Sequence, residues 1–180
     1  MSSWLRLLAP RYRVGAVYEL SPPVLRAWGI EALMLDLDNT LVLWHESVPP
    51  PQVQAWVREL QRSRIPACVV TNSLSRRARA VAATLDLPVA HGVFKPSRAK
   101  LRRALALLGT AREQTAMVGD QLFTDVLAGN RLGVPTVLTV PLAPRESLRT
   151  RALRVLERVV LAVLVRRGLA PGLIPPANGQ

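Results

Sequence analysis

Four of the five aspartates in this 180-residue chain lie at or just beyond the ends of apolar runs that predict strands. These four are Asp36, Asp38, Asp120 and Asp125, and the fifth is Asp86. Asp36 interrupts the apolar run 32–37, although carboxylates are rare in strands and costly to bury unless they are paired or hold a cation. The positions therefore predict an acidic site at the edge of a sheet, where ligands bind in open α/β domains.

The chemistry that suits such a set of carboxylates is phosphoryl transfer. A carboxylate nucleophile and a substrate phosphate repel each other unless a cation neutralises both. A hard divalent ion with oxygen ligands does this, and Mg²⁺ is the usual choice. We expect Asp36 and Asp120 to meet around that ion from two neighbouring strand ends. Asp38 would lie within reach of the leaving group, where it can protonate the departing oxygen and later deprotonate the attacking water.

The elements that must position these residues alternate along the chain. Short runs, almost continuous in apolar residues, are typical of parallel strands covered on both faces: residues 32–37, 67–71, 88–93, 115–118 and 136–140. Helical patterns lie between them, at residues 51–63, 75–85, 97–108 and 124–132. Pro51 and Ser75 are typical helix starts, and Gly109 and Gly133 are typical helix ends. The alternation predicts a three-layer, Rossmann-like α/β domain with a mainly parallel central sheet.

A basic segment follows this predicted domain, which spans residues 1–144 and begins with a lead-in at 1–30. Residues 145–169 predict an amphipathic helix with arginines on one side and apolar residues on the other. The arginines are Arg151, Arg154 and Arg158, and the apolar residues are Leu148, Ala152, Leu156, Val159 and Val163. The apolar face can pack on the sheet or attach to an anionic membrane, and the sequence leaves both open. The proline-containing tail 170–180 is expected to be irregular.

The formal net charge of +12 comes almost wholly from arginine and favours polyanionic partners: nucleic acid, phosphorylated substrates or an anionic lipid surface. A genome biased toward arginine codons would give the same composition. No apolar run approaches the roughly 20 residues of a membrane-spanning helix, and residues 1–10 are too interrupted for a secretory signal. The lone Cys68 excludes an intramolecular disulfide and gives no sign of a zinc cluster. We therefore expect a cytoplasmic protein that can lie on the inner face of the membrane.

Four stretches of the chain resemble, in the same order, the motifs of the haloacid dehalogenase (HAD) superfamily. Residues 36–41 (DLDNTL) resemble the first motif, DxDxT after an apolar strand, and residues 69–72 (VVTN) resemble the second, a strand ending in Thr. Residues 94–96 (FKP) resemble the third, which supplies a lysine, and residues 119–125 (GDQLFTD) resemble the fourth, GDxxxxD. The first motif alone is only moderately specific, but four motifs in order identify the chain as a member of this superfamily.

The resemblance implies a role for each matching carboxylate. Asp36 would be the nucleophile that forms an aspartyl-phosphate. Asp38 would be the general acid and base, with its backbone carbonyl on the metal. Asp120 would ligate Mg²⁺, and Asp125 would ligate it or orient a bound water.

The resemblance also implies a phosphate-binding site built from the second and third motifs. Thr71 would hydrogen-bond a phosphate oxygen, assisted by the backbone N–H of Asn72. Lys95 would balance the negative charge of the nucleophile and the phosphoryl group. It is one of only two lysines in the chain, which makes its place in the third motif notable.

The spacing of the motifs leaves no room for the cap domain that HAD enzymes for small metabolites usually carry. Residues 41–71 and 71–95 each accommodate only a loop, one helix and one strand. An uncapped site must exclude water through a macromolecular substrate, a membrane surface or a neighbouring subunit. Residues 119–122 (GDQL) and 124–126 (TDV) give the fourth motif a more specific form. With these marks, the chain from about residue 10 to residue 141 resembles one capless subgroup, the subfamily IIIA phosphatases of YqeG type, which include phosphatidylglycerophosphate phosphatases.

This resemblance implies a Mg²⁺-dependent phosphomonoester hydrolase that converts phosphatidylglycerophosphate into phosphatidylglycerol at a membrane surface. An apolar N-terminal patch around Arg6 would be either an interfacial anchor or a short helix docked on the domain: Trp4, Leu5, Leu7 and Leu8. The alternative is a soluble phosphatase for a sugar phosphate or a nucleotide, closed by oligomerisation. A basic nucleic-acid-binding module without catalysis is a third class, against which the four motifs argue.

Overall fold

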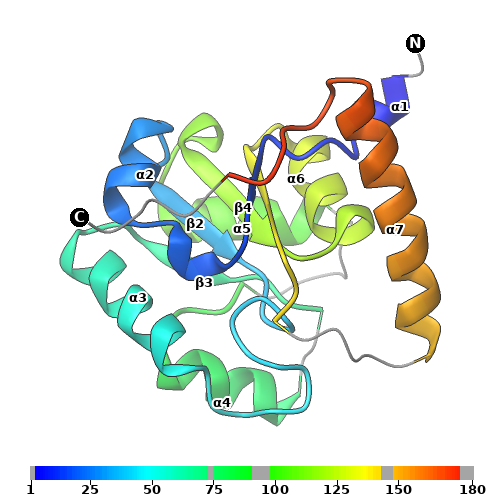
Figure 1. The fold of residues 1–180 in the computed structure, drawn as a ribbon. Coiled ribbons are helices and arrows are strands. Elements are labelled where there is room, and N and C mark those ends of the chain that lie inside the picture. Colours follow the sequence, from blue (N-terminus) through cyan, green and yellow to red (C-terminus); the bar gives the residue numbers. More distant parts are fainter. Residues whose placement is uncertain (1–2, 73–74, 91–97, 143–147, 175–180) are drawn as a thin grey trace.

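The computed structural model describes residues 3–72, 75–90, 98–142 and 148–174. These residues contain a five-stranded sheet in the order β1-β5-β4-β2-β3, in which every neighbouring pair is parallel (Figure 1). The strands are β1 (Tyr12–Val14), β2 (Ala32–Leu35), β3 (Ala67–Val69), β4 (Thr115–Gly119) and β5 (Thr136–Thr139). The predicted α/β class with a parallel central sheet is therefore confirmed.

Helices cover both faces of this sheet and make the fold three-layered. The helices on one face are α2 (Pro22–Ala27), α3 (Pro51–Arg62) and α4 (Arg76–Thr84), and those on the other are α5 (Arg98–Leu108) and α6 (Leu127–Leu132). Successive strand residues point to opposite faces, so Leu33 and Leu35 join the first core and Met34 joins the second. Burial on both faces explains why the strand sequences are almost continuously apolar.

The remaining elements are short, except for one C-terminal helix. They are α1 (Ser3–Arg6), the 3₁₀ turns η1 (Val17–Glu19) and η2 (Arg112–Gln114), the π-helical turn η3 (Leu122–Val126), and the long helix α7 (Leu148–Arg166). No described helix combines the length and the apolarity that a membrane span requires.

Local sequence signals set several helix ends as predicted. The Ser75 side chain accepts a hydrogen bond from the Ala78 backbone N–H at 3.1 Å and caps the start of α4. Pro51 occupies the first position of α3, where its missing N–H costs nothing. Gly133 ends α6 with a φ of 83°, a left-handed conformation that favours glycine.

Three stretches differ from the sequence prediction. The run 88–93 contributes an isolated parallel bridge between Val89 and Val69, and residues 91–93 lie outside the described part of the chain. The helix expected over 124–132 is divided, because η3 forms its start as a π-helical turn and α6 begins only at Leu127. β1 was not predicted, because a three-residue strand with Arg13 at its centre shows no apolar run.

Other segments of the chain pair with both outer strands of the sheet. At β1, the Ile174 N–H donates to the Arg13 carbonyl at 2.8 Å, and Arg13 Nη1 donates to the Pro171 carbonyl at 3.1 Å. The segment that follows α7 therefore lies against the first strand. At the other edge, the Val69 N–H donates to the Pro88 carbonyl at 2.8 Å.

Helix α7 packs on the domain through apolar residues that the predicted apolar side did not include. Val160, Leu161 and Leu164 contact apolar residues of η3, α6 and β5. Leu156 and Val159, which belong to the predicted apolar side, are 52% and 56% exposed. Arg154, which belongs to the predicted basic side, faces the domain, and its contacts are described below. Side chains of residues 148–152 lie outside the described set.

The N-terminal patch is divided between the domain and the surface. Leu8 is buried in one cluster with Leu164 of α7, so this part of the chain is docked on the C-terminal helix. Trp4 remains 56% exposed, and Leu7 is 37% exposed. The patch therefore combines a docked segment with an exposed apolar tip.

We expect Cys68 to be inert in the folded protein, because it lies fully buried in β3 and burial raises the pKa of its thiol to about 12. Alkylation by iodoacetamide at pH 8 should be slower by about a hundredfold or more in native protein than in denatured protein. Mass spectrometry of the modified chain would measure both rates. Equal rates would contradict the placement of β3 in the core.

Candidate active site

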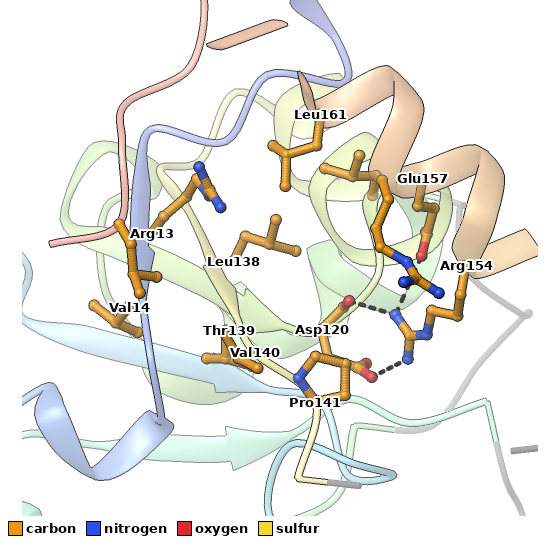
Figure 2. A pocket seen from close by; sticks show the side chains of 13 residues that line it. Arg13, Val14, Asp120, Leu138, Thr139, Val140, Pro141, Arg154, Glu157 and Leu161 are labelled. Atoms are coloured by element: carbon orange, nitrogen blue, oxygen red, sulfur yellow. Dashed lines mark hydrogen bonds and ion pairs between the residues drawn. The ribbon is translucent and has the colours of Figure 1, made fainter. Parts of the chain in front are cut away.

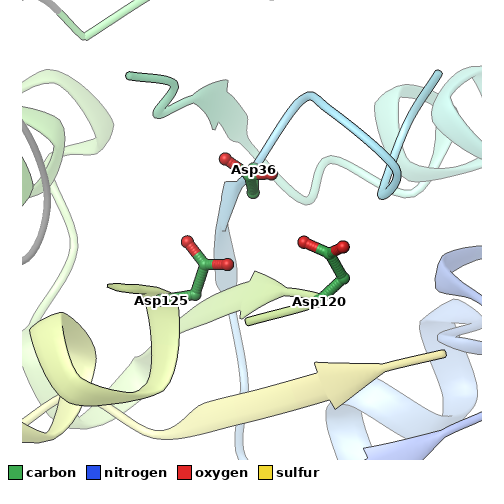
Figure 3. Close-up of side chains that lie close together, drawn as sticks. All are labelled: Asp36, Asp120 and Asp125. Carbon is green, nitrogen blue, oxygen red and sulfur yellow. The ribbon is translucent and has the colours of Figure 1, made fainter. Parts of the chain in front are cut away.

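Three buried carboxylates meet at one end of the central strands. Asp36 follows β2, Asp120 follows β4, and Asp125 lies in η3. One oxygen from each carboxylate lies within 4.8 Å of the others, and the side chains point toward a common space (Figure 3). Their exposed fractions are 7%, 4% and 1%. The site therefore gathers three acidic side chains away from bulk water.

The parallel register of β2 and β4 brings the first two carboxylates together. Leu35 of β2 lies opposite Val118 of β4, so the next residues along each strand emerge at the same sheet edge. The Asp36 N–H donates to the Val118 carbonyl at 2.8 Å and continues the strand pairing into the site. The predicted convergence of Asp36 and Asp120 is what the structure shows.

Gly119 allows Asp125 to complete the cluster. A Cβ at this position would lie 2.3 Å from both Cγ and Oδ2 of Asp125, closer than real Cβ atoms come. The π-helical turn η3 carries Asp125 back toward the strand end, and its Oδ2 accepts the Gln121 N–H at 3.2 Å. Glycine in the fourth motif is thus a requirement of the close carboxylate packing.

The electrostatics of the cluster favour a bound cation. Burial raises the pKa of Asp120 well above its usual range, Arg154 opposes this rise, and the nearby charges of Asp36 and Asp125 add to it. Asp120 Oδ1 is buried and has no hydrogen-bond partner in the part of the chain that is described. An all-oxygen donor set with an unsatisfied buried oxygen fits a hard divalent ion.

Arg154 of α7 reaches into the same site, which the sequence did not predict. Its guanidinium forms an ion pair with the Asp120 carboxylate and donates to the Asp120 backbone carbonyl at 2.6 Å (Figure 2). It also donates to Glu157 Oε2 at 3.1 Å. The signal that could have revealed it is Glu157, the only acid in α7, one turn further along the same helix.

Glu157 is itself buried and holds the helix to the site. Its Oε1 accepts the Phe123 N–H of η3 at 3.2 Å, and burial raises its pKa. A buried carboxylate needs partners of this kind, because an unpaired one is costly. Through Arg154 and Glu157, α7 is joined to both η3 and Asp120.

Asp38 lies two residues beyond the nucleophile candidate but outside the three-carboxylate cluster. Its half-buried side chain forms an ion pair with Arg77 of α4. Arg77 also donates to the Glu46 carbonyl at 2.7 Å, so it connects α4 with the loop after β2. Arg77 was not predicted, since nothing in its spacing distinguishes it from the other arginines. The acid–base role of Asp38 stays a prediction.

The second-motif residues follow β3, next to the strand that carries Asp36. The Val70 N–H donates to the Leu35 carbonyl at 2.8 Å, so Thr71 and Asn72 emerge beside Asp36. Thr71 is 3% exposed, and Asn72 is half-buried. Their phosphate-binding role stays a prediction.

The third-motif Lys95 lies outside the described residues, and its role also stays a prediction. The other lysine of the chain, Lys100 of α5, is 1% exposed and donates from Nζ to the Thr71 carbonyl. No role could be assigned to this lysine from the sequence, because its position is defined only once α5 packs beneath the second motif. A buried cation therefore supports the end of β3.

Comparison with known proteins agrees with this geometry. The profile of the haloacid dehalogenase-like hydrolases matches residues 24–133, more than half of the chain. The chain belongs to this family, and it is a phosphatase of the HAD type.

The similar proteins are also named as phosphatases. The chain is 32% identical to the probable phosphatase YqeG of Bacillus subtilis, over 91% of this chain and 95% of that protein. It is 31% identical to phosphatidylglycerophosphate phosphatase 1 of Arabidopsis thaliana, over 82% of this chain but only 45% of that longer protein. Among solved structures, the deoxy-D-mannose-octulosonate 8-phosphate phosphatase of Haemophilus influenzae matches with a TM-score of 0.52 and 17% identity, over 74% of this chain and 88% of that one. That last likeness concerns the fold alone.

We expect Gly119→Ala to lower kcat/KM for p-nitrophenyl phosphate by about a hundredfold, because the new Cβ displaces the Asp125 carboxylate. Gly172→Ala is the matched control, since a Cβ there meets no atom of the described residues within 4 Å. Circular dichroism would verify that both variants are folded. Wild-type activity in folded Gly119→Ala would contradict the role given to this glycine.

Proposed function

We propose that this chain is a Mg²⁺-dependent phosphomonoester hydrolase that works through an aspartyl-phosphate on Asp36. The observation that carries the proposal is the buried cluster of Asp36, Asp120 and Asp125, in which one carboxylate oxygen of Asp120 has no hydrogen-bond partner among the described residues. These three side chains, with the backbone carbonyl of Asp38, would hold the ion. When bound, Mg²⁺ reduces the repulsion between the carboxylate nucleophile and the anionic phosphate.

The first half of the proposed reaction transfers the phosphoryl group to the protein. A carboxylate oxygen of Asp36 attacks the phosphorus, and the bond from phosphorus to the leaving oxygen breaks. Asp38 donates a proton to that departing oxygen, so the product leaves as a neutral alcohol. The ion pair with Arg77 holds the Asp38 side chain from the flanking helix.

The second half returns Asp36 to its starting state. Asp38, now ionised, takes a proton from water, and the water oxygen attacks the phosphorus of the aspartyl-phosphate. The bond between phosphorus and the Asp36 oxygen breaks, which releases inorganic phosphate. Thr71, the Asn72 N–H and Lys95 would hold the phosphoryl oxygens throughout, and Lys100 supports Thr71 through its backbone carbonyl.

We further propose that the substrate is phosphatidylglycerophosphate, converted into phosphatidylglycerol. Relatives in Arabidopsis and Chlamydomonas, 31% and 30% identical, carry the name of that phosphatase. The net charge of +12 suits an anionic membrane surface. Between β2 and β3 the described chain holds one helix and loops, so a lipid surface can take the place of a cap. The protein would act as a peripheral protein on the inner membrane face.

Asp36→Asn should lower Mg²⁺-dependent hydrolysis by a factor of about 10³ or more, because an amide cannot serve as the nucleophile. The measurement is phosphate release from phosphatidylglycerophosphate, sugar phosphates and nucleotides, for both wild type and variant. We expect wild-type activity to be highest on phosphatidylglycerophosphate.

Asp86→Asn is the matched control for this substitution. Asp86 is exposed and has a φ of 52°, which asparagine tolerates, so the control should retain wild-type activity. Turnover retained in Asp36→Asn would remove the nucleophile assignment. A preference for a sugar phosphate or a nucleotide would instead remove the lipid substrate while the mechanism stands.

Binding to liposomes should require anionic lipid and weaken as salt is added, since each basic residue near such a surface contributes about 1 kcal/mol. Val159→Glu on the outer face of α7 should reduce the co-sedimented fraction by about tenfold. Leu107→Glu on α5 is the control, because Val159 and Leu107 are 56% and 52% exposed. Equal recovery with neutral lipid would argue against a membrane-surface enzyme.

A further inference from the structure

A cavity of about 480 Å³ lies beside the carboxylate cluster, between α7 and the edge of the sheet formed by β1 and β5 (Figure 2). Most of its wall is apolar: Leu122, Leu138, Val140, Pro141, Leu161 and Leu173. This volume is within the range of pockets that hold small molecules or parts of larger ones. None of the proposed catalytic steps uses this cavity.

The cavity and the proposed reaction site share one residue. Asp120 belongs to the carboxylate cluster and also lines the cavity. Arg154 lies at the boundary, because it lines the cavity while its guanidinium binds the Asp120 side chain and backbone carbonyl. A molecule whose phosphate is bound at the cluster can therefore extend its leaving-group end into the cavity.

The charged residues of the cavity indicate what else that molecule carries. Arg13, Arg154 and Arg158 line it together with two acids, Asp120 and Glu157. Arg154 forms ion pairs with both acids. Within the described chain, Arg13 and Arg158 form no ion pair, and burial lowers the pKa of Arg13. Arg158 and Arg13, whose Nη1 also donates to the Pro171 carbonyl, are thus the two guanidiniums that can attract a second anionic group.

We infer that this cavity binds the leaving-group side of an amphiphilic phosphomonoester. The first apolar segment of the leaving group packs against the apolar wall. A second anionic group, between that segment and the phosphate, lies near Arg13 and Arg158. This inference rests on the proposed phosphatase function, which it deepens by giving the lipid part of the substrate a binding site. Selectivity then comes from a pocket in the protein, in addition to any attraction to the membrane.

The test uses substrates in monomeric solution, so that membrane attachment plays no part. The probes are a short-chain phosphatidylglycerophosphate below its micelle concentration, glycerol 3-phosphate and p-nitrophenyl phosphate. Wild type should show a higher kcat/KM for the short-chain lipid than for glycerol 3-phosphate, by about tenfold or more, because several methylenes enter the cavity.

Leu173→Glu places a carboxylate at the mouth of the cavity, where the native side chain is 50% exposed and its replacement is compatible with folding. The ratio of kcat/KM for the short-chain lipid to that for p-nitrophenyl phosphate should fall about tenfold, mainly through KM. Leu107→Glu, at a similarly exposed position on α5 outside the cavity, should leave this ratio unchanged. Arg158→Gln provides a second variant on an exposed position, and it should lower the same ratio.

The outcomes separate this inference from the proposed function. An unchanged ratio in both Leu173→Glu and Arg158→Gln would overturn the cavity assignment. The cavity assignment would also be overturned if the wild type hydrolysed p-nitrophenyl phosphate but did not prefer the short-chain lipid over glycerol 3-phosphate. In both cases the phosphatase mechanism would stand. A folded wild type that hydrolyses none of the three probes with Mg²⁺ would overturn the proposed function and the inference together.

Discussion

The repulsion among three carboxylates held away from water is the constraint on which this structure depends. β2 and β4 end side by side, so Asp36 and Asp120 must share one small space. Because Gly119 has no Cβ, Asp125 can approach them. Such a cluster costs free energy unless cations offset it. Arg154 supplies part of that positive charge, and the arrangement of oxygens suits a divalent ion for the remainder.

The sequence predicted what depends on the alternation of strands and helices and on local spacing. The sheet, the caps at Ser75 and Gly133, and the meeting of Asp36 with Asp120 follow from such patterns, because parallel strands end at one edge. It missed contacts that depend on the rotation of a packed helix. The guanidinium of Arg154 reaches the site only because α7 docks through Val160, Leu161 and Leu164, and arginine spacing alone cannot fix that rotation.

Helix α7 connects features that the sequence treated as separate. Its inner side binds Asp120 through Arg154 and η3 through Glu157, and it also forms one wall of the apolar cavity. Its outer side leaves Val155, Leu156 and Val159 exposed. One helix therefore borders the acidic site and the cavity while presenting an apolar surface outward, which suits the proposed lipid substrate.

The segments that lie against the outer strands have a consequence for self-association. An uncovered strand offers its N–H and C=O groups to other chains and invites sheet-to-sheet polymerisation. Here the Ile174 N–H donates a hydrogen bond to the Arg13 carbonyl at one edge, and the Val69 N–H donates one to the Pro88 carbonyl at the other. Truncation before Ile174 would therefore expose the Arg13 carbonyl at the outer edge of β1.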